Sequence, residues 1–139
     1  MHLTSRTILI ADDHAATRSV LRELCEIDGW RVVEARDGLE VVERAKECKP
    51  AVVLTDLVMP VIDGVEGARR LRADPELKQT VIIAVTGLSL SRRQVDRLER
   101  LFDAVLRKPI RASALRKRLD AARSRRPAFS SDREDTRPD

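Results

Sequence analysis

Two adjacent carboxylates, Asp12 and Asp13, directly follow the short apolar run Ile8–Ala11. Like charges side by side repel each other and resist burial, so this pair favours a cation lying against it. Mg²⁺ is a suitable cation, because it prefers one or two carboxylates together with waters and phosphate oxygens. The pair therefore predicts part of a divalent-metal site whose other components lie elsewhere in the chain.

Other chemically useful side chains also stand directly after short apolar runs. Asp56 follows the run that begins at Ala51, Thr86 and Gly87 follow the next run, and Lys108 with Pro109 follows the last. These positions supply a carboxylate, a hydroxyl and an ammonium group. Whether they meet the acid pair depends on the elements that carry them.

The five apolar runs predict strands, and several are continuously apolar, which is typical of strands buried on both faces. They are Thr7–Ala11, Trp30–Val33, Ala51–Leu54, Val81–Val85 and Ala104–Leu106. Segments of helical period separate or follow them, namely Thr17–Ile27, Leu39–Cys48, Val65–Leu71, Arg92–Leu101 and Ala112–Ala122. This alternation predicts an α/β fold: a flavodoxin-like, doubly wound parallel sheet of five strands in the order 2-1-3-4-5, with five helices.

In such an open sheet, ligands bind beyond the carboxyl ends of the strands, where the strand order reverses. The residues of interest follow strands one, three, four and five, which surround that point. Each of these residues also has a structural explanation that involves no shared site. Asp12 and Asp13 could cap a helix N-terminus, Asp56 and Thr86 could be turn residues, and Lys108 could be a solvated surface charge. A shared site accounts for all of them at once, each at a strand end.

These residues resemble the receiver domain of response regulators in two-component signalling. The resemblance spans about Arg6 to Ala122. The matching motifs are Asp12-Asp13, the run from Asp56 through Met59-Pro60 to Asp63-Gly64, Thr86-Gly87 and Lys108-Pro109.

The resemblance implies that Asp56 accepts a phosphoryl group from a sensor histidine kinase or a histidine phosphotransfer protein. Asp13, Asp56 and the backbone carbonyl of Val58 are then expected to bind Mg²⁺ directly, with Asp12 acting through a water. His14, next to the acids, is interpreted as a loop or first-turn residue. The only reactions catalysed would be the domain's own phosphorylation and dephosphorylation.

The remaining motif residues receive supporting roles from the same resemblance. Lys108 is expected to pair with the phosphoryl oxygens, and Pro109 to be a cis-proline that turns the chain. Thr86 is expected to swing inward and hydrogen-bond to the phosphoryl group, for which Gly87 leaves room.

Three positions depart from the common receiver pattern. Val105 stands where many receivers carry a Tyr or Phe switch, and a valine has few rotamers and no hydroxyl. Signalling is therefore expected to pass through backbone shifts near Thr86 to Leu90 and in the fourth helix instead. Val58 and Leu88, two residues past Asp56 and Thr86, are apolar where polar residues often orient the attacking water. We expect them to shield the acyl phosphate and slow self-dephosphorylation.

Length and composition indicate how many domains the chain forms and where in the cell it is expected. The chain has 139 residues, 42% of them hydrophobic and 2% aromatic, which predicts one domain with an aliphatic core. Residues 1–124 are assigned to the receiver domain and residues 125–139 to a polar tail or linker. No apolar stretch suits a membrane span or a secretory signal, so we expect a cytoplasmic protein that does not contact membranes, with Cys25 and Cys48 reduced and packed.

The basic character of the chain bears on its partners. The net charge is +4, and Arg107–Arg126 contains nine basic residues against one acid, Asp120. Weak nucleic-acid binding is therefore permitted, but no aromatic platform or DNA-reading helix accompanies the charge. We favour a downstream protein partner on the face formed by helix four, strand five and helix five, with candidate residues Arg92, Arg93, Arg97, Arg107 and Arg111.

Four readings of the chain follow from these features. The first is a stand-alone receiver whose output is protein–protein contact. The second is the receiver portion of a longer regulator. The third is a nucleic-acid-binding adaptor, and the fourth a pseudo-receiver without phosphorylation, which the complete set of site residues argues against.

Overall fold

The structure is a computed structural model that describes residues 6–123. Its five parallel strands form one sheet in the order β2-β1-β3-β4-β5, which confirms the predicted topology. The strands are β1 (Thr7–Ala11), β2 (Arg31–Ala35), β3 (Val52–Asp56), β4 (Val81–Thr86) and β5 (Ala104–Arg107). The helices are α1 (Ala15–Ile27), α2 (Gly38–Cys48), α3 (Gly64–Ala73), the short 3₁₀ helix η2 (Pro75–Leu77), α4 (Arg92–Leu98) and α5 (Ala112–Arg123).

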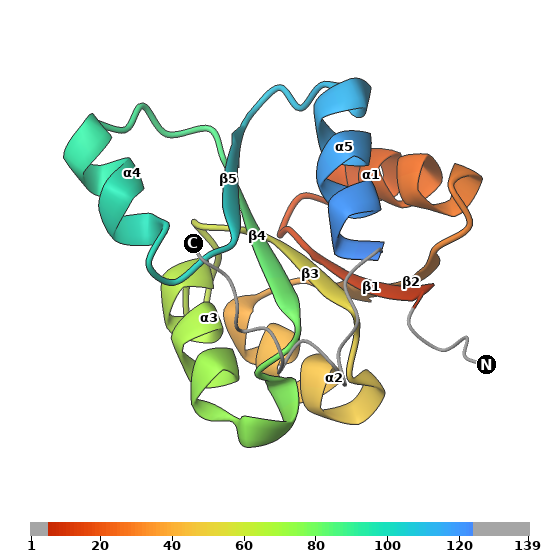
Figure 1. Cartoon of the computed structure of the whole chain (residues 1–139), viewed down its shortest axis with the longest axis horizontal. Helices are drawn as coiled ribbons and strands as arrows, with labels where there is room; N and C mark the ends of the chain where they lie inside the picture. Colours follow the sequence, from red (N-terminus) through yellow and green to blue (C-terminus); the bar gives the residue numbers. More distant parts are fainter. Residues whose placement is uncertain (1–5, 124–139) are drawn as a thin grey trace.

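The continuously apolar strands divide their side chains between two cores, because successive residues of a strand point to opposite faces. Ile8 and Ile10 of β1 pack in one cluster with residues of α1 and α5, such as Leu21. Leu9 and Ala11 pack in the other cluster with residues of α2 and α3. Figure 1 shows α1 and α5 grouped on one side of the sheet and α2 and α3 on the other. The sheet is therefore covered on both faces, as its lack of alternation predicted.

Three of the helices begin at side chains that cap them. Asp37, Asp63 and Ser91 each accept a hydrogen bond from a backbone N–H within the first turn of the helix that follows, at 2.8, 2.9 and 3.2 Å. Such caps satisfy N–H groups that have no partner inside the helix. They place the starts of α2, α3 and α4 at defined points after β2, β3 and β4.

Helix α4 is shorter than the sequence pattern predicted. The expected helix Arg92–Leu101 ends at Leu98, and the backbone N–H groups of Leu101 and Phe102 both bond to the Leu98 carbonyl. This turn brings Phe102 into the core, where it is 2% exposed. Burial of the aromatic ring outweighs continuation of the helix, since the helix itself contains no buried residue.

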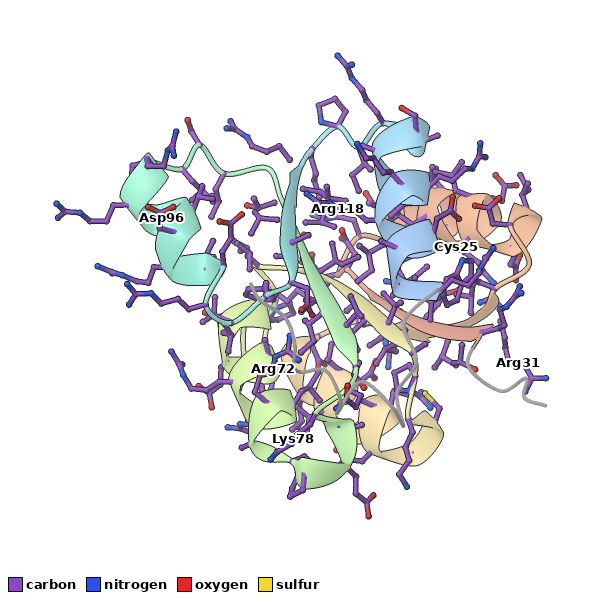
Figure 2. All side chains as sticks on the ribbon, in the orientation of Figure 1. Cys25, Arg31, Arg72, Lys78, Asp96 and Arg118 are labelled. Atoms are coloured by element: carbon purple, nitrogen blue, oxygen red, sulfur yellow. The ribbon has the colours of Figure 1, made fainter. Side chains whose placement is uncertain are left out.

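The two cysteines differ in environment, which gives a testable difference in reactivity. Cys25 lies on α1 (Figure 2) and is completely buried, whereas Cys48 is half-buried. Burial, together with the nearby Asp28 and Glu26 charges, raises the pKa of the Cys25 thiol to about 12, and burial also raises the pKa of Cys48. At pH 8 only about one Cys25 thiol in 10⁴ is then ionised.

We therefore expect N-ethylmaleimide to alkylate Cys48 well before Cys25 in the folded protein at pH 8. Peptide mass mapping over time measures the two rates, and protein unfolded in urea is the control in which both cysteines react alike. Equal rates in the folded protein would contradict the assigned burial.

The described residues include no helix that is both long and apolar enough to cross a membrane. The predicted tail, residues 125–139, lies outside the described residues.

Candidate functional site

The strand register brings the chemically active residues to one edge of the sheet. Ala11 pairs with Thr55, so Asp12 and Asp56 come next to each other at the ends of β1 and β3. Thr86 is the last residue of β4 and pairs with Arg107 of β5, which places Lys108 directly beyond the same edge. The predicted convergence of these residues is thus present in the fold.

Lys108 connects the two buried acids. Its Nζ lies 2.9 Å from Asp56 Oδ2 and 3.2 Å from Asp12 Oδ2. Asp12 is 1% exposed and Asp56 6% exposed, so the ammonium group offsets two charges that water reaches poorly. Burial by itself lowers the pKa of Lys108, but its hydrogen bonds to Asp56 and Asp12 outweigh this effect and the pKa is raised. A peptide bond in the cis form joins Lys108 to Pro109, as predicted.

A second cluster forms around the acid pair. The ligand atoms of Asp12, Asp13 and His14 all lie within 4.8 Å of one another, and His14 Nδ1 is 3.4 Å from Asp12 Oδ1 and 3.3 Å from Asp13 Oδ1. His14 occupies the N-cap position of α1, in agreement with its interpretation as a first-turn residue. Asp56 is not in this three-residue group, and its described ion-pair partner is Lys108.

The donor set fits a hard divalent cation. Asp12 and Asp56 are buried carboxylates at one edge, and Asp13 beside them is exposed to water. Carboxylate oxygens with access to water are the ligands that Mg²⁺ prefers. The ammonium group of Lys108 contacts both Asp12 and Asp56, so a cation bound by these two carboxylates would share them with the lysine.

Two backbone N–H groups hold the Asp56 carboxylate and the Thr86 hydroxyl in place. The N–H of Val58 donates to Asp56 Oδ1 at 3.3 Å, and the N–H of Leu88 donates to Thr86 Oγ1 at 2.9 Å. Thr86 is completely buried, and among residues 6–123 a methyl group on Gly87 would touch only Lys108 Cδ, at 3.8 Å. Val58 and Leu88 themselves carry exposed apolar side chains, 59% and 46% exposed.

Glycine is required where α3 begins beneath the site. The N–H of Gly64 donates to the carbonyl of Leu57 at 2.9 Å, and a methyl group on Gly64 would lie 2.1 Å from the carbonyl oxygen of Asp56. The hydroxyl of Thr55 donates to that same carbonyl at 2.9 Å. The backbone of Asp56 is therefore enclosed by the start of α3 and by its own strand.

Arg18 contributes to the site although sequence reasoning did not single it out. Its Nη1 donates to the Asp12 carbonyl at 2.8 Å, and its Nε donates to Glu34 of β2 at 2.8 Å. Hydrogen bonds from Arg18 and then Arg22 lower the pKa of Glu34. The available signal was the pair Arg18 and Arg22, spaced four residues apart on one side of a predicted helix.

Part of the basic run in the last helix is used inside the domain. Arg116 pairs with Asp28 at 3.3 Å, and the guanidinium group of Arg123 lies 5.0 Å from the ring centroid of Trp30. These contacts attach α5 to the end of α1, so this part of the charge serves packing. The five arginines expected on the partner face, Arg92, Arg93, Arg97, Arg107 and Arg111, are all exposed.

A sequence model of the response regulator receiver domain matches residues 8–120. This range contains all five strands except Thr7, the first residue of β1, and it contains most of α5. The chain belongs to this family. Response regulator receiver domains act in two-component signalling, and they are signalling proteins rather than conventional enzymes. The resemblance inferred from the acid pair, Asp56, Thr86 and Lys108 is thereby confirmed at the level of the family.

Relatives of this receiver domain include polar-differentiation response regulators DivK. The protein from Brucella anthropi is 31% identical over 85 residues, which cover 61% of this chain and 69% of the relative. The protein from Brucella ovis is 30% identical over 86 residues, which cover 62% and 70% of the two chains.

Solved receiver structures have the same fold. The receiver domain of a sensor histidine kinase from Pseudomonas aeruginosa PAO1 has a TM-score of 0.77 at 26% identity, covers 84% of this chain and 96% of its own, and has a magnesium ion coordinated in its active-site cleft. Chemotaxis response regulator CheY4 of Vibrio cholerae has a TM-score of 0.76 at 25% identity and covers 84% and 97% of the two chains.

Proposed function

We propose that this receiver domain accepts a phosphoryl group on Asp56 from a phosphohistidine of a histidine kinase or histidine phosphotransfer protein. The observation that carries the proposal is the buried Asp56 carboxylate at the sheet edge, held by Lys108 at 2.9 Å. A carboxylate oxygen forms the new bond to phosphorus while the bond from phosphorus to the histidine nitrogen breaks. The product is an acyl phosphate, whose oxygens Lys108 then neutralises.

Asp12, Asp13, Asp56 and the carbonyl of Val58 are the residues proposed to hold Mg²⁺. When bound, the metal would neutralise negative charge on the phosphoryl group during its transfer. The buried and exposed carboxylates of this cluster support the assignment, as does the magnesium ion in the active-site cleft of the related Pseudomonas aeruginosa receiver.

We propose that transmission of the phosphorylation signal through the domain begins with a movement of Thr86. Turning its hydroxyl toward a phosphoryl group on Asp56 breaks the hydrogen bond from the Leu88 N–H, so the backbone after β4 moves. Val105 on β5 is half-buried and has no hydroxyl or ring to follow the threonine. The proposed contact surface for a downstream protein, which this movement switches, consists of exposed arginines on α4, on β5 and just before α5: Arg92, Arg93, Arg97, Arg107 and Arg111.

The donor is proposed to dock on a groove beside Lys108. This groove has a volume of about 390 Å³ and lies between α1 and the segment that joins β5 to α5. Val20, Leu24 and Ile110 are among the residues that line it, and Val20 is 57% exposed. An apolar surface next to the lysine that contacts Asp56 allows a helix carrying the phosphohistidine to approach the acceptor.

A Val20→Asp variant is expected to slow phosphotransfer from a histidine phosphodonor by about tenfold or more, because a carboxylate in the groove opposes apolar docking. Phosphorylation by acetyl phosphate is expected to stay unchanged, since this small donor needs no groove. Quench-flow measurement with radiolabelled donor gives both rates. Ile27→Asp is the matched control: Ile27 lies on the same helix, is 76% exposed and is not among the groove-lining residues. Equal slowing by both variants would contradict the docking site.

The apolar side chains of Val58 and Leu88 are expected to slow hydrolysis of the acyl phosphate. A Val58→Asn, Leu88→Glu double variant is expected to lose its label about tenfold faster, because polar groups there can orient the attacking water. Loss of radiolabel after removal of the donor, with Mg²⁺ present, measures the rate. Single variants separate the two positions, and an unchanged lifetime in the double variant would overturn the idea.

The test of the proposed function is phosphotransfer from a panel of radiolabelled histidine kinases, followed by reduction of the product with borohydride. Reduction converts a phosphorylated aspartate to homoserine, and peptide mass spectrometry then identifies its position. The expected position is that of Asp56. Failure of every kinase and of acetyl phosphate to label the folded protein would favour the pseudo-receiver reading, whereas a label at another residue would move the acceptor.

A further inference from the structure

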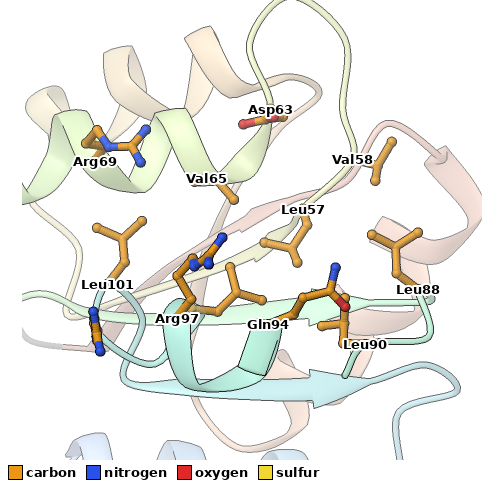
Figure 3. Close-up of a pocket in the computed structure, with 12 residues that line it drawn as sticks. Leu57, Val58, Asp63, Val65, Arg69, Leu88, Leu90, Gln94, Arg97 and Leu101 are labelled. Atoms are coloured by element: carbon orange, nitrogen blue, oxygen red, sulfur yellow. The ribbon is translucent and has the colours of Figure 1, made fainter. Parts of the chain in front are cut away.

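A second, larger groove lies between α3 and α4, on the other side of the site from α1. Its volume is about 520 Å³. Figure 3 shows side chains of α3, of α4 and of the loops after β3 and β4 turned toward the space between the two helices. The apolar members of its lining include Leu57, Val65, Leu88, Leu90, Leu98 and Leu101.

The packing of α4 leaves this groove open. Helix α4 has no buried residue, and Figure 1 shows it standing away from the sheet that the other helices cover. Leu98 and Leu101 are only partly buried against the core, and Leu88 is 46% exposed. An apolar surface of this kind, rimmed by charged residues, is typical of a site that another protein covers.

The charges on the rim indicate what kind of partner fits. Arg69, Arg97 and Arg100 line the groove, with Asp63 as the one acid in the lining. Arg69 pairs with Glu66 at 3.2 Å, but the guanidinium groups of Arg97 and Arg100 form no ion pair with any residue between 6 and 123. Two unpaired cations beside an apolar surface complement an acidic, amphipathic segment.

We propose that the α3–α4 groove binds an acidic amphipathic helix of a partner protein. Leucine-like side chains at positions i, i+3, i+4 and i+7 of that helix occupy the groove, and flanking carboxylates pair with Arg97 and Arg100. A second copy of this chain is a poorer occupant, because a two-fold contact through the same patch would bring the arginines of both copies together. Arg97 therefore belongs to this groove as well as to the exposed arginines of α4.

The groove reaches the phosphorylation site through two residues. Val58 and Leu88 line its end, and their N–H groups donate to Asp56 and Thr86. Any change in these two hydrogen bonds moves the groove wall. Phosphorylation of Asp56 therefore changes the affinity of the groove for its partner, and a bound partner changes phosphorylation in return. This coupling rests on the proposed phosphorylation of Asp56, whereas binding itself does not.

The probe is a synthetic peptide of about 18 residues with leucines on one helical face and glutamates on the other, and its counterpart has lysine in place of each glutamate. ¹⁵N-labelled, unphosphorylated protein is titrated with each peptide and followed by amide NMR shifts. The glutamate peptide is expected to shift groove residues and to bind at least about tenfold more tightly than the lysine peptide. Because no phosphoryl donor is present, the outcome is independent of the proposed function.

Variants assign the binding to the groove. Arg97→Glu and Leu88→Asp are each expected to weaken binding of the glutamate peptide about tenfold. The control is Arg92→Glu, which makes the same charge change on the same helix outside the groove lining. It is expected to change the affinity by less than about twofold. Circular dichroism verifies that each variant is folded. The proposal would be overturned if both peptides bound equally well, or if neither caused a shift at about 1 mM. It would also be overturned by shifts confined to α1, or by equal effects of Arg97→Glu and Arg92→Glu.

Discussion

Replacing Asp56 by Asn is expected to abolish phosphorylation by histidine phosphodonors and by acetyl phosphate. An amide oxygen is a far weaker nucleophile than a carboxylate, and the change also removes one anion from the proposed Mg²⁺ site. The expected loss in the rate of labelling is at least about 10³-fold. Incorporation of radiolabel over time, at equal protein concentration, measures it.

The matched control is Asp63→Asn, which makes the same chemical change at the other end of the loop that follows β3. Asp63 caps α3, and asparagine caps helices about as well as aspartate, so labelling is expected to continue at the unmodified rate. The Asp56→Asn protein is also expected to stay folded, because the amide side chain still offers an oxygen to Lys108 and the repulsion with Asp12 falls. Undiminished label in a folded Asp56→Asn protein would place the acceptor elsewhere.

Replacing Gly64 by Ala is expected to cause the largest loss of stability among conservative changes near the site. The added methyl group would lie 2.1 Å from the carbonyl oxygen of Asp56, which is backbone and cannot move aside without shifting β3. The expected decrease in the free energy of unfolding is about 3 kcal/mol or more. Urea unfolding followed by circular dichroism measures it, and phosphorylation of the remaining folded protein is expected to fall because Asp56 itself is displaced.

Gly67→Ala is the control within the same helix. A methyl group on Gly67 would lie 3.5 Å from the carbonyl oxygen of Gly38, an ordinary contact, so the change is expected to stabilise α3 by about 0.5–1 kcal/mol. The same substitution, made three residues apart, is thus expected to lower the free energy of unfolding at Gly64 and to raise it at Gly67. Destabilisation of equal size at both positions would show that general helix crowding, rather than the Asp56 carbonyl, limits Gly64.

Much of the site was predictable because a parallel sheet imposes its own geometry. Continuous apolar runs identified the strands, and right-handed crossovers left few strand orders. Carboxyl ends of parallel strands then lie at one edge, so Asp12, Asp56, Thr86 and Lys108 had to be near each other. The predicted convergence needed only the order of elements, without any knowledge of side-chain packing.

Other features depended on contacts between residues far apart in the chain. The sequence pattern extended α4 to Leu101, but burial of Phe102 ended the helix at Leu98. Arg18 had no distinguishing neighbour in sequence beyond Arg22, yet it reaches both the Asp12 carbonyl and Glu34 on β2. In the same way, Arg72 extends from α3 (Figure 2) to Asp103 before β5, 2.8 Å away.

Hydrophobic period and the order of elements along the chain were enough to predict the fold class, the edge of the sheet that carries the candidate site and the residue types that meet there. The contacts of Lys108 with both Asp12 and Asp56, and the position of Arg97 and Arg100 beside an open apolar groove, became visible only in the folded domain. An ion pair or a groove depends on distances between elements. Those distances result from how the side chains of several helices and strands pack together, which no single segment specifies.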